Sequence, residues 1–210
     1  MPRRQIRRGF SLIELIVVIT IIALLIGILL PVLPKVRDAG KRTACAANLR
    51  SVGQAVELYK NDFNEVYPVA RYMPRPWLSG DTDPAFNDTL AAYMEPNSPA
   101  WACPGDKVVA DVTYIDEETG AELVSGVSYR YVSILSGFTL ETNPLVSRLR
   151  FQPTDVPVAH DFDAGTFELE GASADEPGEL ITVDFFHNTR NLLFADGRVD
   201  KYDVGEIPDD

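Results

Sequence analysis

The sequence predicts an α+β fold in which one long N-terminal helix packs on a C-terminal antiparallel β-sheet. Three observations predict it: an apolar run from Phe10 to Leu33, apolar residues that continue at helical spacing to Phe63, and short apolar runs separated by turn residues in the second half. The chain has 210 residues and a formal net charge of −12. This length suits one membrane helix and one modest globular domain.

The first part of the chain is a basic leader followed by an apolar segment. The leader ends at Gly9, and one carboxylate, Glu14, lies inside the apolar run. Secretory signals are cleaved after their apolar region, whereas the obvious small residue here, Gly9, precedes it. The run from Leu15 to Leu33 is close to the ~20 residues that span a bilayer. A carboxylate there costs ~2.5 kcal/mol or more, so Glu14 is expected to pair with a positive charge.

The helix is predicted to continue past the membrane segment to about Asp62. Apolar side chains recur at steps of three and four residues and predict one buried face: Leu49, Val52, Val56, Tyr59 and Phe63. Prolines and glycines are expected to disturb the helix: Gly27, Pro31, Pro34 and Gly40. Charge does not orient the segment, because arginines and lysines flank both of its ends.

The remainder is predicted to be rich in β-strands. Residues 66–102 hold many prolines and aromatic residues, which we expect to cover the core rather than to line a groove. A short helix is expected near Asp88–Met94. Strands are expected at 108–115, 121–124, 128–135, 156–159, 167–169, 180–186, 191–194 and 198–202. Asp196-Gly197 reads as a hairpin turn in which glycine supplies a positive φ.

The N-terminal residues Gly9-Phe10-Ser11-Leu12-Ile13-Glu14 resemble the signal of type IV prepilins and type II secretion pseudopilins. The resemblance implies that a prepilin peptidase cuts after Gly9 and methylates Phe10. It also implies that Glu14 pairs with the N-terminal amine of a neighbouring subunit during filament assembly. The implied organisation is a leader (1–9), a transmembrane and assembly helix (10–34), its amphipathic continuation (35–64) and an extracytoplasmic pilin-like domain (65–210).

The C-terminal segment from His187 to Val199 resembles the motif of a large prepilin-like family of planctomycete-type bacteria, a histidine followed after a spacer by Asp-Gly. Asp196 and Gly197 match that motif, although the spacer is one residue shorter than usual and Arg198 replaces the family's second histidine. Other matching positions lie along the chain: Cys45-x-x-Asn48-Leu49, Tyr67-Pro68, Cys103-Pro104, Ser128-Tyr129 and Asp161.

Cys45 and Cys103 are the two cysteines of the chain. Outside the cytoplasm such a pair can form a disulfide, and the alternative is two buried free thiols. Sequence does not show whether the two residues approach each other closely enough for a bond.

Several acids and both histidines suggest a metal site. Two imidazoles and carboxylates, those of His160, His187 and the neighbouring aspartates, can bind zinc or another divalent ion. Calcium is preferred over a transition metal, because the acidic loops are rich in oxygen, and Asp161, Asp163 and Asp196 are the candidate ligands. A purely structural alternative makes Asp196 a turn residue and His187 a hydrogen-bonding residue at a strand end.

These observations together predict a structural subunit of a type II secretion pseudopilus or a type IV pilus-like filament. The expected partners are prepilin peptidase, other pilin or pseudopilin subunits and an inner-membrane assembly platform. A single-pass inner-membrane location with an extracytoplasmic domain follows from the resemblance. The alternative is an anchored extracytoplasmic protein that binds a ligand or metal. The sequence shows no nucleophile–base signature that would indicate an enzyme, and its acidity argues against nucleic-acid binding.

Overall fold

A break at Pro31 divides the N-terminal helical segment into helix α1 (Leu12–Leu29) and helix α2 (Leu33–Asp62). Helix α2 ends at Asp62, where the sequence predicted the end. Of the four residues expected to disturb the helix, only Pro31 lies at a break. Pro34 lies in the first turn of α2, where its missing N–H removes no hydrogen bond, and Gly27 and Gly40 are accommodated within the helices.

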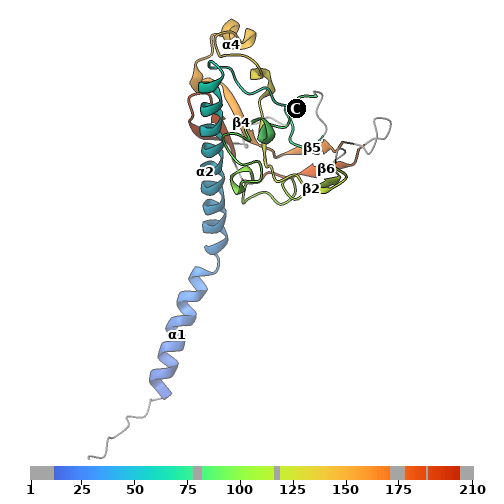
Figure 1. Ribbon diagram of the computed structural model, residues 1–210. Helices are drawn as coiled ribbons and strands as arrows, with labels where there is room; N and C mark the ends of the chain where they lie inside the picture. Colours follow the sequence, from blue (N-terminus) through green and yellow to red (C-terminus); the bar gives the residue numbers. More distant parts are fainter. Residues whose placement is uncertain (1–11, 78–81, 116–118, 171–177, 188, 204–210) are drawn as a thin grey trace, which may run out of the picture. The chain divides into compact units, whose positions relative to one another are not determined.

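The computed structural model describes residues 12–77, 82–115, 119–170, 178–187 and 189–203. The chain forms two compact units, Met1–Gly40 and Lys41–Asp210. The second unit holds the C-terminal part of α2, all of the strands and the core (Figure 1).

Within the second unit, α2 buries the face that the sequence predicted. Leu49, Val52 and Val56 are at most 2% exposed, and Tyr59 is also buried. Phe63 differs from the prediction, because it follows the end of the helix and is 49% exposed, although its ring stacks on Tyr59 at 4.3 Å.

The main sheet has four antiparallel strands in the order β3 (Tyr129–Tyr131), β4 (Pro157–Asp161), β7 (Thr189–Phe194) and β8 (Val199–Asp203). Strands β7 and β8 form the predicted hairpin. Its turn contains Gly197 at φ +80°, a conformation that glycine adopts without the steric cost of a Cβ.

Two small antiparallel pairs complete the strands: β1 (Thr113–Ile115) with β2 (Glu122–Val124), and β5 (Gly165–Glu168) with β6 (Leu180–Val183). These pairs lie on the side of the unit away from α2 (Figure 1). All strands in the described part of the chain overlap the expected ones, but β1, β2, β3 and β6 are shorter than predicted. The connection between β1 and β2 includes residues 116–118, which fall outside the described residues.

Short helices occupy several connections. Helix α3 (Phe86–Thr89) begins two residues before the predicted helix and ends well before Met94. Helix α4 (Pro144–Leu149) was not predicted, although Asn143 and Pro144 signal its start, because the Asn143 side chain accepts hydrogen bonds from the N–H groups of Leu145 and Val146. Three 3₁₀ turns span Pro99–Trp101, Ser133–Leu135 and Pro153–Asp155.

The aromatic residues of the proline-rich region belong to the core, as predicted. Tyr67, Trp77, Phe86 and Trp101 are each at most 3% exposed. Phe86 stacks on Tyr131 of β3 at 4.5 Å, which joins this region to the main sheet. A second, smaller cluster gathers around Trp77 and Phe162 beneath the β5–β6 pair.

Candidate functional site

Helix α1 exposes apolar side chains all round. Its large apolar residues from Leu12 to Leu29 are 46–73% exposed, and none of its residues is buried. By length and composition the helix could cross a membrane, a weak criterion that signal sequences also meet. Glu14 lies in its first turn, where an acid is favoured by the helix dipole. Gly9 and Phe10 fall outside the described residues.

A disulfide joins Cys45 of α2 to Cys103 in the loop after Trp101. The two cysteines are buried, at 0 and 3% exposure, and their Cα atoms are 4.8 Å apart. The bond closes a loop with a sequence separation of 58 residues. The structure therefore contains the disulfide and not the two buried free thiols that the sequence left as an alternative. Both cysteines belong to the second unit of the chain.

His187 lies directly against this disulfide. Its Nε2 atom is 3.2 Å from the Sγ of Cys45 and 3.3 Å from the Sγ of Cys103. Gly105 makes room for the ring, because a Cβ at this position would lie 2.3 Å from Cε1 of His187. The backbone N–H of Gly105 also donates to the Sγ of Cys103 at 3.4 Å.

The loop that carries Cys103 is held by Asp106. Its carboxylate accepts hydrogen bonds from three backbone N–H groups of the following turn and from the Ser128 hydroxyl. The Ser128 hydroxyl oxygen in turn accepts from the N–H of Cys103 at 2.9 Å. This hydrogen-bond network holds the backbone of Cys103 in position. The sulfur atoms of both cysteines contact His187, and that of Cys103 also contacts the N–H of Gly105.

Asp161 at the end of β4 is fully buried. One oxygen, Oδ2, accepts from the N–H of Asn191 at 2.8 Å and from its Nδ2 at 3.0 Å, whereas Oδ1 has no hydrogen-bond partner among the described residues. Burial raises the pKa of Asp161 to about 7, and the hydrogen bonds from Asn191 only partly offset this rise. The neighbouring His160 shifts the other way, because burial and the charge of Arg130 lower its pKa to about 3.

Asp163 is also buried and pairs with Arg190. The Nε of Arg190 lies 2.6 Å from Oδ1, and its Nη2 donates to the Asp163 carbonyl at 2.9 Å. Burial raises the pKa of this carboxyl, while Arg190 counteracts the rise. Arg130 lies nearby with its guanidinium 5.0 Å from the ring centres of Phe162 and Phe167.

Asp196 is a turn residue, which the sequence suggested as the alternative to a metal ligand. Its Oδ1 accepts from the N–H of Arg198 at 3.0 Å. In the described part of the chain, the one group of three or more histidine, cysteine or acidic side chains close enough to share a metal ion is Cys45, Cys103 and His187. The structure thus engages Asp161, Asp163 and Asp196 with other partners, and calcium binding at these residues stays a prediction.

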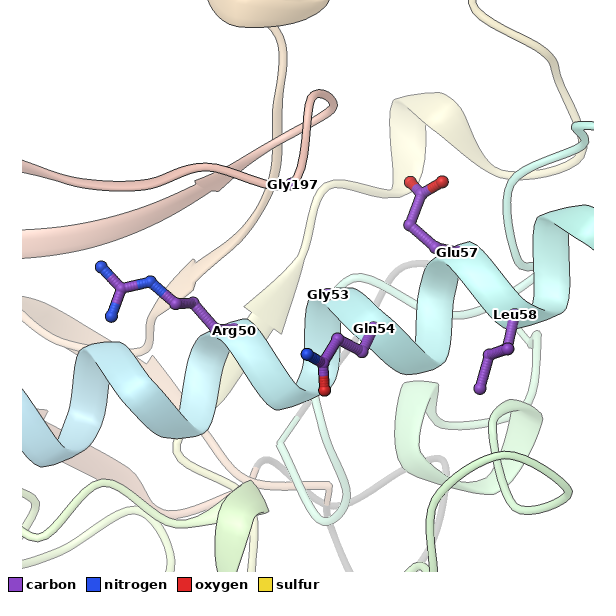
Figure 2. Close-up of a pocket in the computed structure, with 6 residues that line it drawn as sticks. All are labelled: Arg50, Gly53, Gln54, Glu57, Leu58 and Gly197. Atoms are coloured by element: carbon purple, nitrogen blue, oxygen red, sulfur yellow. The ribbon is translucent and has the colours of Figure 1, made fainter.

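A hollow lies between α2 and the β7–β8 turn (Figure 2). Gly53 and Gly197 face each other across it, and its volume is about 460 Å³. A Cβ at Gly53 would lie 2.8 Å from Cδ1 of Leu193, so this glycine lets α2 approach β7 closely. The remaining lining side chains all come from α2: Arg50, Gln54, Glu57 and Leu58.

Sequence reasoning missed the contact between His187 and the cysteines. It treated His187 together with the aspartates, but the fold brings the imidazole to the sulfurs instead. A signal for this contact was present in the sequence, because Cys45, Cys103 and His187 all lie in the segments that carry the resemblance to the prepilin-like family. Near His187, Phe185 is 43% exposed, whereas Phe186 is half-buried against both apolar clusters.

Comparison with known proteins finds similarity over part of the chain. Residues 4–30 match the prokaryotic N-terminal methylation motif. The chain is similar to the type II secretion system core protein G of Klebsiella michiganensis, with 36% identity over 66 residues, 31% of this chain. It is also similar to the protein of the same name from Pseudomonas aeruginosa, with 35% identity over 68 residues, 32% of this chain.

The matched segment covers 46% of each of these relatives, so the chain spans about half the length of the curated proteins it matches. No solved structure matches the chain. The chain therefore carries a prepilin-type motif on an α+β, pilin-like layout, and about a third of it is similar to a type II secretion system core protein.

Proposed function

We propose that this chain is a subunit of a type II secretion pseudopilus or of a related type IV pilus-like filament. The observation that carries the proposal is the match of residues 4–30 to the N-terminal methylation motif, a range that includes Gly9, Phe10 and Glu14. Prepilin peptidase cleaves after Gly9 and methylates the amine of Phe10. The chain is then anchored in the inner membrane by its apolar helix, with residues 65–210 outside the cytoplasm.

Assembly follows from the surface chemistry of α1. In a bilayer, lipid tails are as apolar as leucine, so burial of apolar area does not by itself drive helices together. Charge pairing drives helices together, because an acid and an amine attract each other strongly in an apolar medium, and each costs free energy there when it is unpaired. Glu14 meets the Phe10 amine of a neighbouring subunit, and once subunits leave the bilayer, the exposed apolar side chains of α1 are buried against other copies.

The partners in this proposal are prepilin peptidase, further pilin or pseudopilin subunits and an inner-membrane assembly platform. The similarity to a secretion-system core protein supports a structural rather than a catalytic role. A second function, that of an anchored extracytoplasmic metal-binding protein exported by the same route, is favoured by one observation, the cluster of Cys45, Cys103 and His187.

Processing is tested by intact mass and N-terminal sequencing of the chain extracted from membranes that contain active prepilin peptidase. We expect a start at methylated Phe10, and we expect Gly9→Leu to retain the leader. A chain that still begins at Met1 in such membranes would refute the proposed processing.

Assembly is tested with Glu14→Val in cells that make the filament. This variant should insert into the membrane at least as well as the native chain, because the cost of the acid is removed, but it should be absent from sheared filaments. Thr20→Val is the matched control: it removes the hydroxyl that donates to the Ile16 carbonyl at 2.7 Å, without changing charge, and should assemble normally. Normal incorporation of Glu14→Val would contradict the assigned role.

A further inference from the structure

The sulfurs of Cys45 and Cys103 share one imidazole nitrogen. Nε2 of His187 is nearly equidistant from them, at 3.2 and 3.3 Å, and three separate segments of the chain supply the three atoms. A structural disulfide requires no such neighbour. A nitrogen aimed between two sulfurs is, however, the arrangement of a site with two thiolates and one imidazole.

The distances suit a thiophilic metal ion. Zinc binds sulfur at about 2.3 Å and imidazole nitrogen at about 2.0–2.1 Å, so a tetrahedral site separates nitrogen from sulfur by about 3.6 Å. The observed separations are only a few tenths of an ångström shorter. Conversion to a metal site therefore leaves His187 almost in place and needs mainly the two sulfurs to move apart.

The surroundings select soft ligands. The nearby carboxylate, that of Asp106, accepts four hydrogen bonds from its own loop and from Ser128, so it is already engaged. The N–H of Gly105 points at the Sγ of Cys103, a contact that favours a thiolate over a thiol. Both cysteines are buried, and two thiolates there need a cation to balance their charge.

We propose that the dithiol form of Cys45 and Cys103, together with His187, binds one thiophilic d¹⁰ ion, with Zn²⁺ as the probe, and that the ion and the disulfide are alternative occupants of one site. Reduction by a dithiol transfers two electrons and two protons to the disulfide, and the reductant becomes a disulfide itself. Binding of Zn²⁺ then displaces the two thiol protons. Zn–S bonds replace the S–S bond, and the site becomes neutral.

The test uses the full chain in mild detergent, either oxidised or reduced with a phosphine that is then removed anaerobically. Zinc binding is measured by competition with a chromophoric chelator. We expect about one equivalent per reduced chain and none per oxidised chain. Cobalt in place of zinc should give thiolate-to-metal charge-transfer absorption, and a parallel titration with Cu⁺ shows which thiophilic ion the site prefers.

Two variants and one control test the geometry. His187→Ala should weaken zinc binding at least tenfold, because loss of a ligand should cost no less than loss of a supporting residue. His160→Gln, which changes the other histidine of the chain, should bind as the native chain does. Gly105→Ala keeps all three ligands but pushes a methyl group against the His187 ring, and it should also weaken binding.

Gly105→Ala also separates a folded site from binding by an unfolded chain. An unfolded reduced chain would hold zinc through the same ligands whether residue 105 is glycine or alanine. Zinc binding that does not respond to Gly105→Ala or to His187→Ala would therefore overturn the proposal. Absence of zinc and Cu⁺ binding by the reduced chain would overturn it as well.

Discussion

The sharpest prediction concerns the substitution Asp161→Asn at the end of β4. The side chain is fully buried, and only Oδ2 is hydrogen-bonded, to the backbone and side chain of Asn191. An asparagine keeps the shape and one acceptor oxygen, so both hydrogen bonds from Asn191 survive. Its amide nitrogen takes the position of the Asp161 Oδ1, which lacks a hydrogen-bond partner among the described residues. The substitution therefore removes a titrating group and leaves the packing in place.

The magnitude follows from the pKa. Burial raises the pKa of Asp161 from 3.8 to about 7, so the native state holds its proton over a pH range in which the unfolded chain has lost it. Stability therefore falls as pH rises from about 4 to about 7. At ~1.4 kcal/mol per pKa unit the loss approaches ~4 kcal/mol, an upper limit because structural relaxation around the ionised carboxylate reduces its cost.

His160 opposes this trend in the native chain. Its pKa is lowered to about 3, so between pH 3 and 6.5 the unfolded chain binds a proton that the native state does not. Stability gained from His160 as pH rises through this range offsets the loss from Asp161. A flat pH profile of the native chain would therefore hide two large effects, and the variant is needed to reveal them.

The assay is urea unfolding of the full chain in mild detergent, followed by the fluorescence of the buried Trp77 and Trp101, at pH 4 to 8. The difference in unfolding free energy between Asp161→Asn and the native chain cancels all groups common to both. It should be near zero at pH 4 and should favour the variant by up to a few kcal/mol at pH 8. A difference that is constant with pH, or a variant that becomes relatively less stable as pH rises, would show that Asp161 is ionised in the native state and refute the reasoning.

Two further stability predictions concern glycines, both measured by the same urea unfolding. Gly197→Val should destabilise the domain by ~1–2 kcal/mol through its positive φ alone, since no atom lies within 4 Å of an added Cβ. Gly197→Asn should destabilise it less, because asparagine tolerates this conformation. Equal losses of stability in the two variants would point to a lost contact instead. Gly53→Ala should destabilise the domain by ~1–3 kcal/mol because its methyl group meets Leu193. Combining it with Leu193→Val should relieve much of that loss of stability. Additive effects of the two substitutions would argue against the close contact.

The fold was largely predictable because its main signals are local. The apolar period of α2 from Leu49 to Tyr59 is a property of neighbouring residues, and so is the turn at Asp196-Gly197. The errors also have local causes. Phe63 continues the helical spacing but follows the end of α2 at Asp62, and Pro34 stands where a first turn tolerates proline.

The site was less predictable because its members meet only through tertiary structure. In the sequence, the carboxylates of three aspartates suggest oxygen ligands for a metal: Asp161, Asp163 and Asp196. In the fold, these carboxylates contact protein groups instead, those of Asn191, Arg190 and Arg198 respectively. No spacing in the sequence links Cys45 to His187, which lie 142 residues apart along the chain. Composition can thus suggest a metal, but only the tertiary structure decides which ligands face each other.

The segment that begins at His187 contacts α2 at two places, and this gives the C-terminal motif a physical role. His187 lies against the Sγ of Cys45, and Leu193 in the following strand lies against Gly53, two turns further along the helix. The Asp196-Gly197 turn then ends the strand beside the same helix. A histidine, a strand and a tight turn at this spacing therefore hold β7 along α2. Any change in the state of the cysteines acts at the first of these contacts, and so on the seating of the sheet against the helix.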